Sequence, residues 1–321
     1  MKRGSHLIFF LTAVMFFVTH TYAVESEKKY HVYVDDQSVA SFESYKEALY
    51  FSYQYERVKI LDGQDLRLLY HNHLKFNVST VGDKTANTKK FYEYQTAVEH
   101  AKKIEGKVTT LNTNKKVWDS THLPQNNQIE LNRIKQFPEL PRGCSVVSLA
   151  MLLNHTGINI DKMALMAQVH KQDKAYQSIE GQVEFADPYY GFVGEVSTFE
   201  EPGLGVYFPA IYELMLNHLG DRALNVSGTD FEDLFYLIDM NKPIWTMVNA
   251  KYQRLNEEDF LTWYVDGQPV QITKWMHAVV VTGYDDDHIY VADPLEKVSK
   301  VSRQGFIEAY NQMGKQALSY Q

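Results

Sequence analysis

The sequence has little cysteine: Cys144 carries the only thiol in 321 residues. A single cysteine cannot form a disulfide within the chain, so packing alone must stabilise the fold. The thiol is then either a small buried core residue or a reactive group. Paired cysteines, a His-Glu-x-x-His motif and a glycine-rich phosphate loop are also missing, so the sequence predicts no metal and no cofactor.

Positive charge is scarce as well. The net charge is -8 and the sequence pI is about 5.8, with no long basic run, which argues against a nucleic-acid partner. Apolar runs long enough to cross a bilayer are missing, because the run from Leu7 to Val18 falls short of the roughly 20 residues required.

The run from Leu7 to Val18 has the features of an export signal. Lys2 and Arg3 precede it, and small residues at Thr21 to Ala23 suit a cleavage site. We therefore expect residues 1–23 to be removed and the mature chain to be secreted, without a transmembrane domain. An uncleaved anchor is the alternative.

The next segment contains an internal repeat at a spacing of 49 residues. The matched positions are Phe42, Tyr45, Ala48 and Ser52 with Phe91, Tyr94, Ala97 and Ala101. Each unit is predicted as a strand, an amphipathic helix (42–55 and 91–104) and a closing strand (58–61 and 108–111, at a spacing of 50). Residues 28–120 would form a small α/β module. This module could bind the cell wall, dock the substrate or inhibit the catalytic half, or it could be a structural appendage.

The remaining chain, residues 121–321, has the residues of a catalytic domain. A polar, proline-containing entry segment reaches Pro141, and Cys144 then begins an apolar helix that Gly157 should end. A thiol at a helix N-terminus has a lowered pKa because it lies at the positive end of the helix dipole. Gly143 beside it would let a substrate backbone approach.

A histidine and an aspartate accompany the thiol. His277 begins an apolar strand, and Asp293 ends the next strand after an acidic turn. If Val281 pairs with Ile289, His277 lies directly opposite Asp293 on the same face. Asp293 would then orient the imidazole while its other nitrogen faces Cys144. A register slip of one residue would separate them.

Other polar residues give weaker signals. Gln136 lies in the entry loop and could donate its side-chain amide to an oxyanion, together with the backbone N–H of Cys144. His71 and His73 could share a strand face, but no further ligand is near them in the sequence. The acidic turn 285–287 could attract calcium, although a solvated hairpin turn is the ordinary interpretation.

Several segments together resemble the bacteriocin-processing-like (double-glycine-peptidase-like) papain-fold cysteine peptidases over residues 124–321. The matching segments are Gln136 to Cys144 with the helix to Asn154 and Gly157, Asp187 to Gly194, Gly205 to Tyr207, Lys242 to Trp245, His277 to Tyr284, and Val291 to Pro294. Ser145 departs from the family, in which the residue after the cysteine is often acidic.

The resemblance implies an α+β fold: a papain-like peptidase domain with a central helix and an antiparallel sheet, preceded by the repeat module. It implies Cys144 as nucleophile, His277 as base, Asp293 as orienting residue and Gln136 as oxyanion donor. The expected function is secreted hydrolysis of peptide bonds through an acyl-enzyme. The expected partner is a peptide or protein substrate, which could be associated with the cell wall. Acyl transfer by the same triad and a catalytically silent surface-binding module are the alternatives.

Overall fold

The computed structural model describes residues 30–321 apart from 53, 56, 64–65, 67, 72–74 and 83–87. The predicted export signal lies outside the described residues, as does His73. Within the described ranges, the helices are all too short or too polar to cross a membrane.

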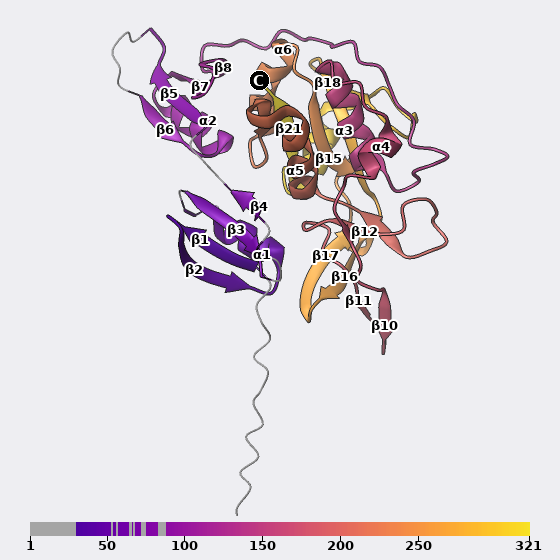
Figure 1. Ribbon diagram of the computed structural model, residues 1–321. Coiled ribbons are helices and arrows are strands. Elements are labelled where there is room, and N and C mark those ends of the chain that lie inside the picture. The colour runs from indigo at the N-terminus through magenta and orange to yellow at the C-terminus, as the bar shows by residue number, and fades with distance from the viewer. Residues whose placement is uncertain are drawn as a thin grey trace, which may run out of the picture.

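The N-terminal part consists of two units that lie on one side of the larger half (Figure 1). The first contains β1 (Tyr30–Val34), β2 (Gln37–Phe42), α1 (Tyr45–Ser52), β3 (Val58–Asp62) and β4 (Leu68–His71). The second contains β5 (Phe76–Thr80), β6 (Lys89–Phe91), α2 (Tyr94–Lys103), β7 (Gly106–Thr110) and β8 (Lys116–Asp119). Their sheets have the strand orders β2-β1-β3-β4 and β6-β5-β7-β8, so the two units share one connectivity.

The predicted boundaries within these units need correction. Phe42 and Phe91 end strands and do not begin helices, because they pair with Tyr30 and Phe76. Each helix starts three residues later than predicted, and each unit has an extra strand at both ends.

The predicted spacing of the closing strands is also wrong. Tyr30 pairs with Asp62 and Phe76 pairs with Thr110, so these strands correspond at a spacing of 48 residues and not 50. The second unit therefore has a shorter turn before its closing strand. That strand begins with Gly106, where a Cβ would lie 2.7 Å from the carbonyl oxygen of Ser79.

The larger half is built on a six-stranded antiparallel sheet of order β14-β21-β15-β18-β19-β20. Its strands are β14 (Ala223–Asn225), β15 (Ile244–Asn249), β18 (Met276–Tyr284), β19 (His288–Ala292), β20 (Lys300–Ser302) and β21 (Ala317–Tyr320). The helices are α3 (Cys144–His155), α4 (Lys162–Met166), α5 (Phe208–Leu219), α6 (Phe235–Asp239) and α7 (Arg303–Gln312), with short 3-10 helices at Gly220–Arg222, Phe231–Leu234 and Glu257–Asp259.

Smaller sheets flank this core. One combines β10 (Gln177–Ile179), β11 (Gln182–Glu184), β16 (Phe260–Val265) and β17 (Gln268–Thr273), and extends away from the main sheet in Figure 1. Another combines β9 (Lys171–Gln172), β12 (Phe192–Gly194) and β13 (Gly203–Gly205).

The main sheet separates two apolar cores. Alternate residues of β18 face opposite sides: Ala278 and Val280 pack with α3 and α5, whereas Val279 and Val281 pack with α6 and α7. The first N-terminal unit contributes to the core on the α3 side, and the second unit contributes to the other core. β18 is therefore buried along its whole length, which explains its continuous apolar sequence.

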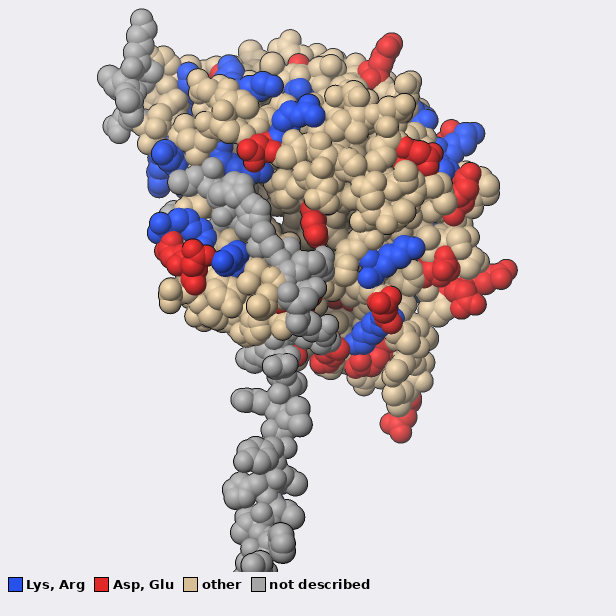
Figure 2. All heavy atoms as spheres, viewed as in Figure 1, with Lys and Arg blue, Asp and Glu red and all other residues tan. Residues whose placement is uncertain are grey.

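The surface carries both signs of charge. On the face shown in Figure 2, acidic and basic side chains are interspersed over the larger half. This face does not present a single broad basic area of the kind that attracts nucleic acid.

Candidate active site

Cys144 is the first residue of α3, as the sequence predicts. Its side chain is buried, with 6% of the residue exposed. Gly143 precedes it, and a Cβ at that position would lie 2.6 Å from the Cβ of Leu140. The glycine is therefore required for the entry loop to pack closely against the start of the helix. At the other end, Gly157 has a positive φ of 89° and follows the helix, as predicted.

Polar contacts fix α3 to its surroundings near the thiol. The hydroxyl of Ser145 donates to the Val206 carbonyl at 2.8 Å, and the Trp245 indole donates to the Ser145 carbonyl at 2.9 Å. The hydroxyl of Ser148 donates to the Ala278 carbonyl at 2.9 Å, immediately beside His277. Ser145 is fully enclosed, and its hydroxyl has a partner, so the serine at this position leaves no unpaired buried group.

His277 and Asp293 are in contact. The Nε2 atom of His277 lies 2.8 Å from Oδ1 of Asp293, and both residues are buried. The remaining ring nitrogen, Nδ1, is available to the thiol, and a hydrogen bond between His277 and Cys144 contributes to the electrostatics of both groups. The structure thus brings Cys144, His277 and Asp293 together in that order.

The predicted register of the hairpin is wrong by two residues. Val281 pairs with Val291, not with Ile289, and Val280 pairs with Ala292. Residues 285–287 form the turn, as predicted, and the Asp285 carboxylate accepts the backbone N–H groups of Asp287 and His288, but the pairing of Tyr284 with Ile289 and an irregularity between Val281 and Gly283 shift the register. A slip of two keeps the same sheet face, so His277 reaches Asp293 diagonally and not from directly opposite.

The charges of the three groups are coupled. Burial by itself would raise the pKa of the Cys144 thiol, but the hydrogen bond and charge of His277 outweigh it and the pKa is lowered. Burial would lower the pKa of His277, but Asp293 and Cys144 raise it to about 9. Burial would raise the pKa of Asp293, but contact with His277 lowers it. These directions favour a thiolate beside an imidazolium.

Gln136 lies in the same region and is buried. Its backbone N–H donates to the Pro294 carbonyl at 3.0 Å, which ties the entry loop to the residue after Asp293. Its side-chain Nε2 donates to the Pro141 carbonyl at 2.6 Å. An amide nitrogen carries two hydrogens, so one remains for a further acceptor.

A neighbouring loop is held beside the nucleophile by Arg142. The guanidinium donates to the carbonyls of Glu195, Thr198, Phe199 and Glu201. Phe199 is 62% exposed, and its ring centroid lies 6.2 Å from that of Phe137, which follows Gln136. Two exposed aromatic rings therefore lie together at the loop that Arg142, two residues before Cys144, contacts.

Tyr252 was missed by the sequence interpretation. Its ring lies 6.1 Å from the His277 ring in an edge-on orientation of 81°. It lies 25 residues before His277 in a segment without a recognisable motif, so only the pairing of β15 with β18 brings it to the site.

Of the other sequence candidates, His73 lies outside the described residues, and His71 is the last residue of β4 in the first N-terminal unit. The described residues contain no cluster of three or more histidines, cysteines or acids that could hold a metal. Asp285 lies in the turn that was considered for calcium. Its carboxylate accepts hydrogen bonds from the Tyr290 hydroxyl at 2.7 Å and from backbone N–H groups.

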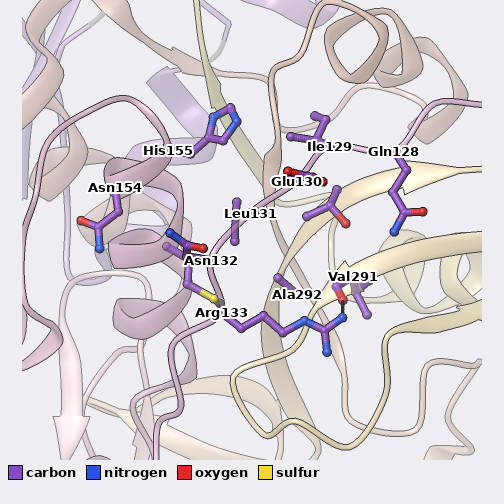
Figure 3. Close-up of a pocket in the computed structure, with 12 residues that line it drawn as sticks. Gln128, Ile129, Glu130, Leu131, Asn132, Arg133, Asn154, His155, Val291 and Ala292 are labelled. Atoms are coloured by element: carbon purple, nitrogen blue, oxygen red, sulfur yellow. Dashed lines mark hydrogen bonds between the residues drawn. The ribbon is translucent and has the colours of Figure 1, made fainter.

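A large open cavity of about 800 Å³ also lies elsewhere (Figure 3). The entry segment 128–133 crosses it, Asn154 and His155 line it from the C-terminal end of α3, and Val291 and Ala292 line it from β19. Cys144 is at the opposite end of α3 from His155, about 16 Å along the axis of a helix of this length. The catalytic candidates do not line this cavity.

Comparison with known proteins identifies the family. The sequence profile of the Peptidase_C39 like family matches residues 118–318. The chain belongs to this family. A curated relative, the "Uncharacterized protein YvpB" of Bacillus subtilis (strain 168), is 36% identical over 186 residues, which cover 57% of this chain and 71% of the relative.

A solved structure gives the same assignment. It is the crystal structure of a protein from Bacillus anthracis named "putative C39-like peptidase". The sequences are 37% identical and the TM-score is 0.56, with 61% of this chain and 98% of the other chain covered. The larger half thus has the fold of a C39-like peptidase.

Proposed function

We propose that this C39-like family member is an exported cysteine peptidase that uses Cys144, His277 and Asp293 as a triad. The observation that carries the proposal is the placement of His277 between the helix-start thiol and a buried carboxylate. A histidine with a purely structural role could remain in contact with water and would not need a thiol and a carboxylate on either side. Burying three ionisable groups together costs free energy unless they stabilise one another. Perturbed and mutually coupled groups of this kind are typical of nucleophilic sites.

The proposed reaction begins with the Cys144 thiolate. It attacks the carbonyl carbon of a peptide bond, and the charge that develops on the carbonyl oxygen is stabilised by the backbone N–H of Cys144 and the amide of Gln136. His277 then gives its proton to the leaving amine, which departs and leaves a thioester on Cys144. Water, deprotonated by His277, attacks the thioester and releases the acid and the free thiol.

Three further features support a peptide substrate outside the cell. Phe137 and Phe199 expose aromatic surface beside the nucleophile, where an apolar side chain of the substrate could pack. The charged and apolar pattern of residues 1–23 is that of an export signal. The absence of cysteines other than Cys144 leaves the thiol without a disulfide partner in an oxidising environment.

The experiment uses the purified mature chain and its Cys144→Ala variant. Each is incubated with bacterial wall material and, separately, with an unstructured protein, and new termini are identified by mass spectrometry. We expect new termini only with the natural chain. Acid quenching during the reaction should yield a Cys144 peptide with the mass of an added acyl group. Identical termini with both proteins would contradict the proposal.

The same experiment separates hydrolysis from acyl transfer. An added primary amine would be incorporated at the new carboxyl end if the acyl-enzyme prefers an amine acceptor. Release of the free acid in the presence of that amine supports the peptidase. Failure to form any acyl adduct would favour the binding-module alternative.

A further inference from the structure

Tyr252 occupies a turn that the local sequence builds next to His277. β15 ends at Asn249, whose Oδ1 accepts the N–H of Lys251 at 3.0 Å and whose Nδ2 donates to the Gln253 carbonyl at 2.8 Å. These bonds reverse the chain immediately after Val248, the residue that pairs with His277. The side chain of Tyr252 is therefore directed back toward the start of β18.

The backbone of Tyr252 is in an uncommon conformation. Its φ is 51°, in the left-handed region that bulky side chains rarely adopt. Helix α7 packs closely against Tyr252. A Cβ at Gly305 would lie 2.7 Å from the Tyr252 carbonyl oxygen, and the Phe306 ring is nearly parallel to the Tyr252 ring. A strained residue that its surroundings hold so closely, next to reactive groups, suggests a functional role.

The polar atoms nearby are incompletely paired. Oδ1 of Asp293 accepts from His277 and from the Leu295 N–H, whereas Oδ2 is buried and makes no hydrogen bond within the described part of the chain. The Tyr252 hydroxyl is also buried, and it too lacks a partner at full hydrogen-bond geometry among the described residues. One is an acceptor and the other a donor, and buried groups of this kind normally find a partner.

The two groups already interact. Burial raises the pKa of the Tyr252 hydroxyl, and the Asp293 carboxylate raises it further, while Tyr252 contributes to lowering the pKa of Asp293. The Tyr252 hydroxyl and the carboxylate that orients His277 are therefore close enough to interact, and the Tyr252 ring lies 6.1 Å from the His277 ring.

We propose that Tyr252 is a positioning residue of the triad, whose hydroxyl donates to Oδ2 of Asp293 and keeps Oδ1 aligned with His277. The role rests on the proposed function, because it matters only if His277 and Cys144 react. Without the hydroxyl, the carboxylate can rotate about its Cβ–Cγ bond, and the imidazolium loses part of its stabilisation. The thiolate that depends on this imidazolium then forms at higher pH.

The ionisable groups that act on Cys144 and His277 are few. Asp293 and Cys144 act on His277, His277 acts on Cys144, and Tyr252 interacts with both Asp293 and Cys144. The ammonium of the adjacent Lys251 lies 2.8 Å from Oδ1 of Asp259. The Asp293→Asn background is needed to separate an effect that Tyr252 exerts through Asp293 from a direct effect on Cys144.

The test measures the rate of iodoacetamide alkylation of Cys144 against pH, which reports the thiolate at a single site because the chain has no other cysteine. We expect Tyr252→Phe to raise the midpoint by about half a pH unit or more. Tyr284→Phe is the matched control, because it removes a hydroxyl 2.6 Å from another buried carboxylate, that of Asp239. Its midpoint should equal that of the natural chain.

A double variant makes the inference specific. In the Asp293→Asn background, Tyr252→Phe should produce no further shift, because the group through which it acts is gone. Circular dichroism confirms that each variant is folded. An unchanged or lower midpoint in Tyr252→Phe, or a shift that persists in the double variant, would overturn the role. Alkylation needs no substrate, so a failure to cleave peptides would reject the proposed function without deciding this test.

Discussion

His277 and Asp293 are joined diagonally across the β18–β19 hairpin, with 2.8 Å between Nε2 and Oδ1. Because Val280 pairs with Ala292, the position directly opposite Asp293 would be that of Val279 and not His277. Diagonal neighbours on one face are farther apart at Cβ than direct partners, and the long imidazole side chain spans the difference. The contact therefore depends on side-chain orientation as well as on strand register.

The first prediction concerns this contact. Asp293→Asn should lower kcat by about a hundredfold or more and change KM little, since Asp293 orients the base without touching substrate. The measurement is steady-state cleavage of a peptide that the natural chain processes. Asp287→Asn, at an exposed position in the same hairpin, is the control and should keep full activity. A large rise in KM with unchanged kcat would contradict the orienting role.

The second prediction is the pH dependence of cleavage. The pKa of His277 is raised to about 9, so the imidazolium persists until the pH passes through about 9. The pKa of Cys144 is lowered, so the thiolate is lost only when the pH falls below that lowered value. We expect a bell-shaped profile of kcat/KM with its alkaline limb near 9.

The same shift has a consequence for stability. A raised histidine pKa stabilises the fold at pH values below the ordinary histidine pKa of 6.5, and this contribution is lost as the pH rises through about 9.

The Cys144→Ala variant tests the origin of the raised pKa. It has no thiolate to stabilise the imidazolium, so the pKa of His277 should fall. NMR titration of the imidazole would measure it. An alkaline limb near 6.5 in the natural chain would show that the ion pair does not form.

The sequence was sufficient for the parts of the site that depend on local patterns. Cys144 at a helix start and the alternation of β18 and β19 follow from residue order, and an error of two in register preserved the face of His277. Tyr252 could not be found in this way, because its turn is brought to His277 only by the pairing of β15 with β18. The boundaries of the N-terminal helices failed for a similar reason: Phe42 and Phe91 fit an amphipathic helix, but pairing with Tyr30 and Phe76 makes them strand residues.

The third prediction tests Gln136. If its free amide hydrogen stabilises the oxyanion, Gln136→Ala should lower kcat by about 10²- to 10³-fold. Gln128→Ala is the control, because Gln128 is exposed in the same entry segment and lines the distant cavity. Gln136 also bonds through its backbone to Pro294, which the substitution keeps. Equal activity of the two variants would leave Gln136 with a structural role only.

The last prediction concerns the junction between the N-terminal units and the larger half. Lys75, just before β5, donates to the Tyr212 hydroxyl at 2.6 Å and to the Ala223 carbonyl at 3.0 Å. Burial lowers the pKa of its ammonium to about 8, and Asp221 and Glu93 only partly oppose this. The charged form is therefore disfavoured in the folded chain relative to the unfolded chain.

The sign of the effect follows from proton binding. Between pH 8 and the ordinary lysine value of 10.5, the unfolded chain binds more protons at this site, so the contribution of Lys75 to the unfolding free energy rises with pH. Lys75→Met keeps the length of the side chain and removes the titration. We expect the unfolding free energy of the natural chain, minus that of Lys75→Met, to increase by about 1–3 kcal/mol over this interval.

Taking the difference between the two proteins removes the titration of His277 and the tyrosines, which is common to both. Denaturant unfolding at pH 7, 8, 9 and 10 gives the required values. Lys103→Met, at an exposed position on α2, should show a constant difference from the natural chain across the same range. If Lys75→Met also shows a constant difference, the ammonium is solvated and the second unit is free to separate from α5. If the difference rises as expected, the second unit is held against the larger half by a desolvated contact, and its removal would expose apolar surface of the domain that carries the triad.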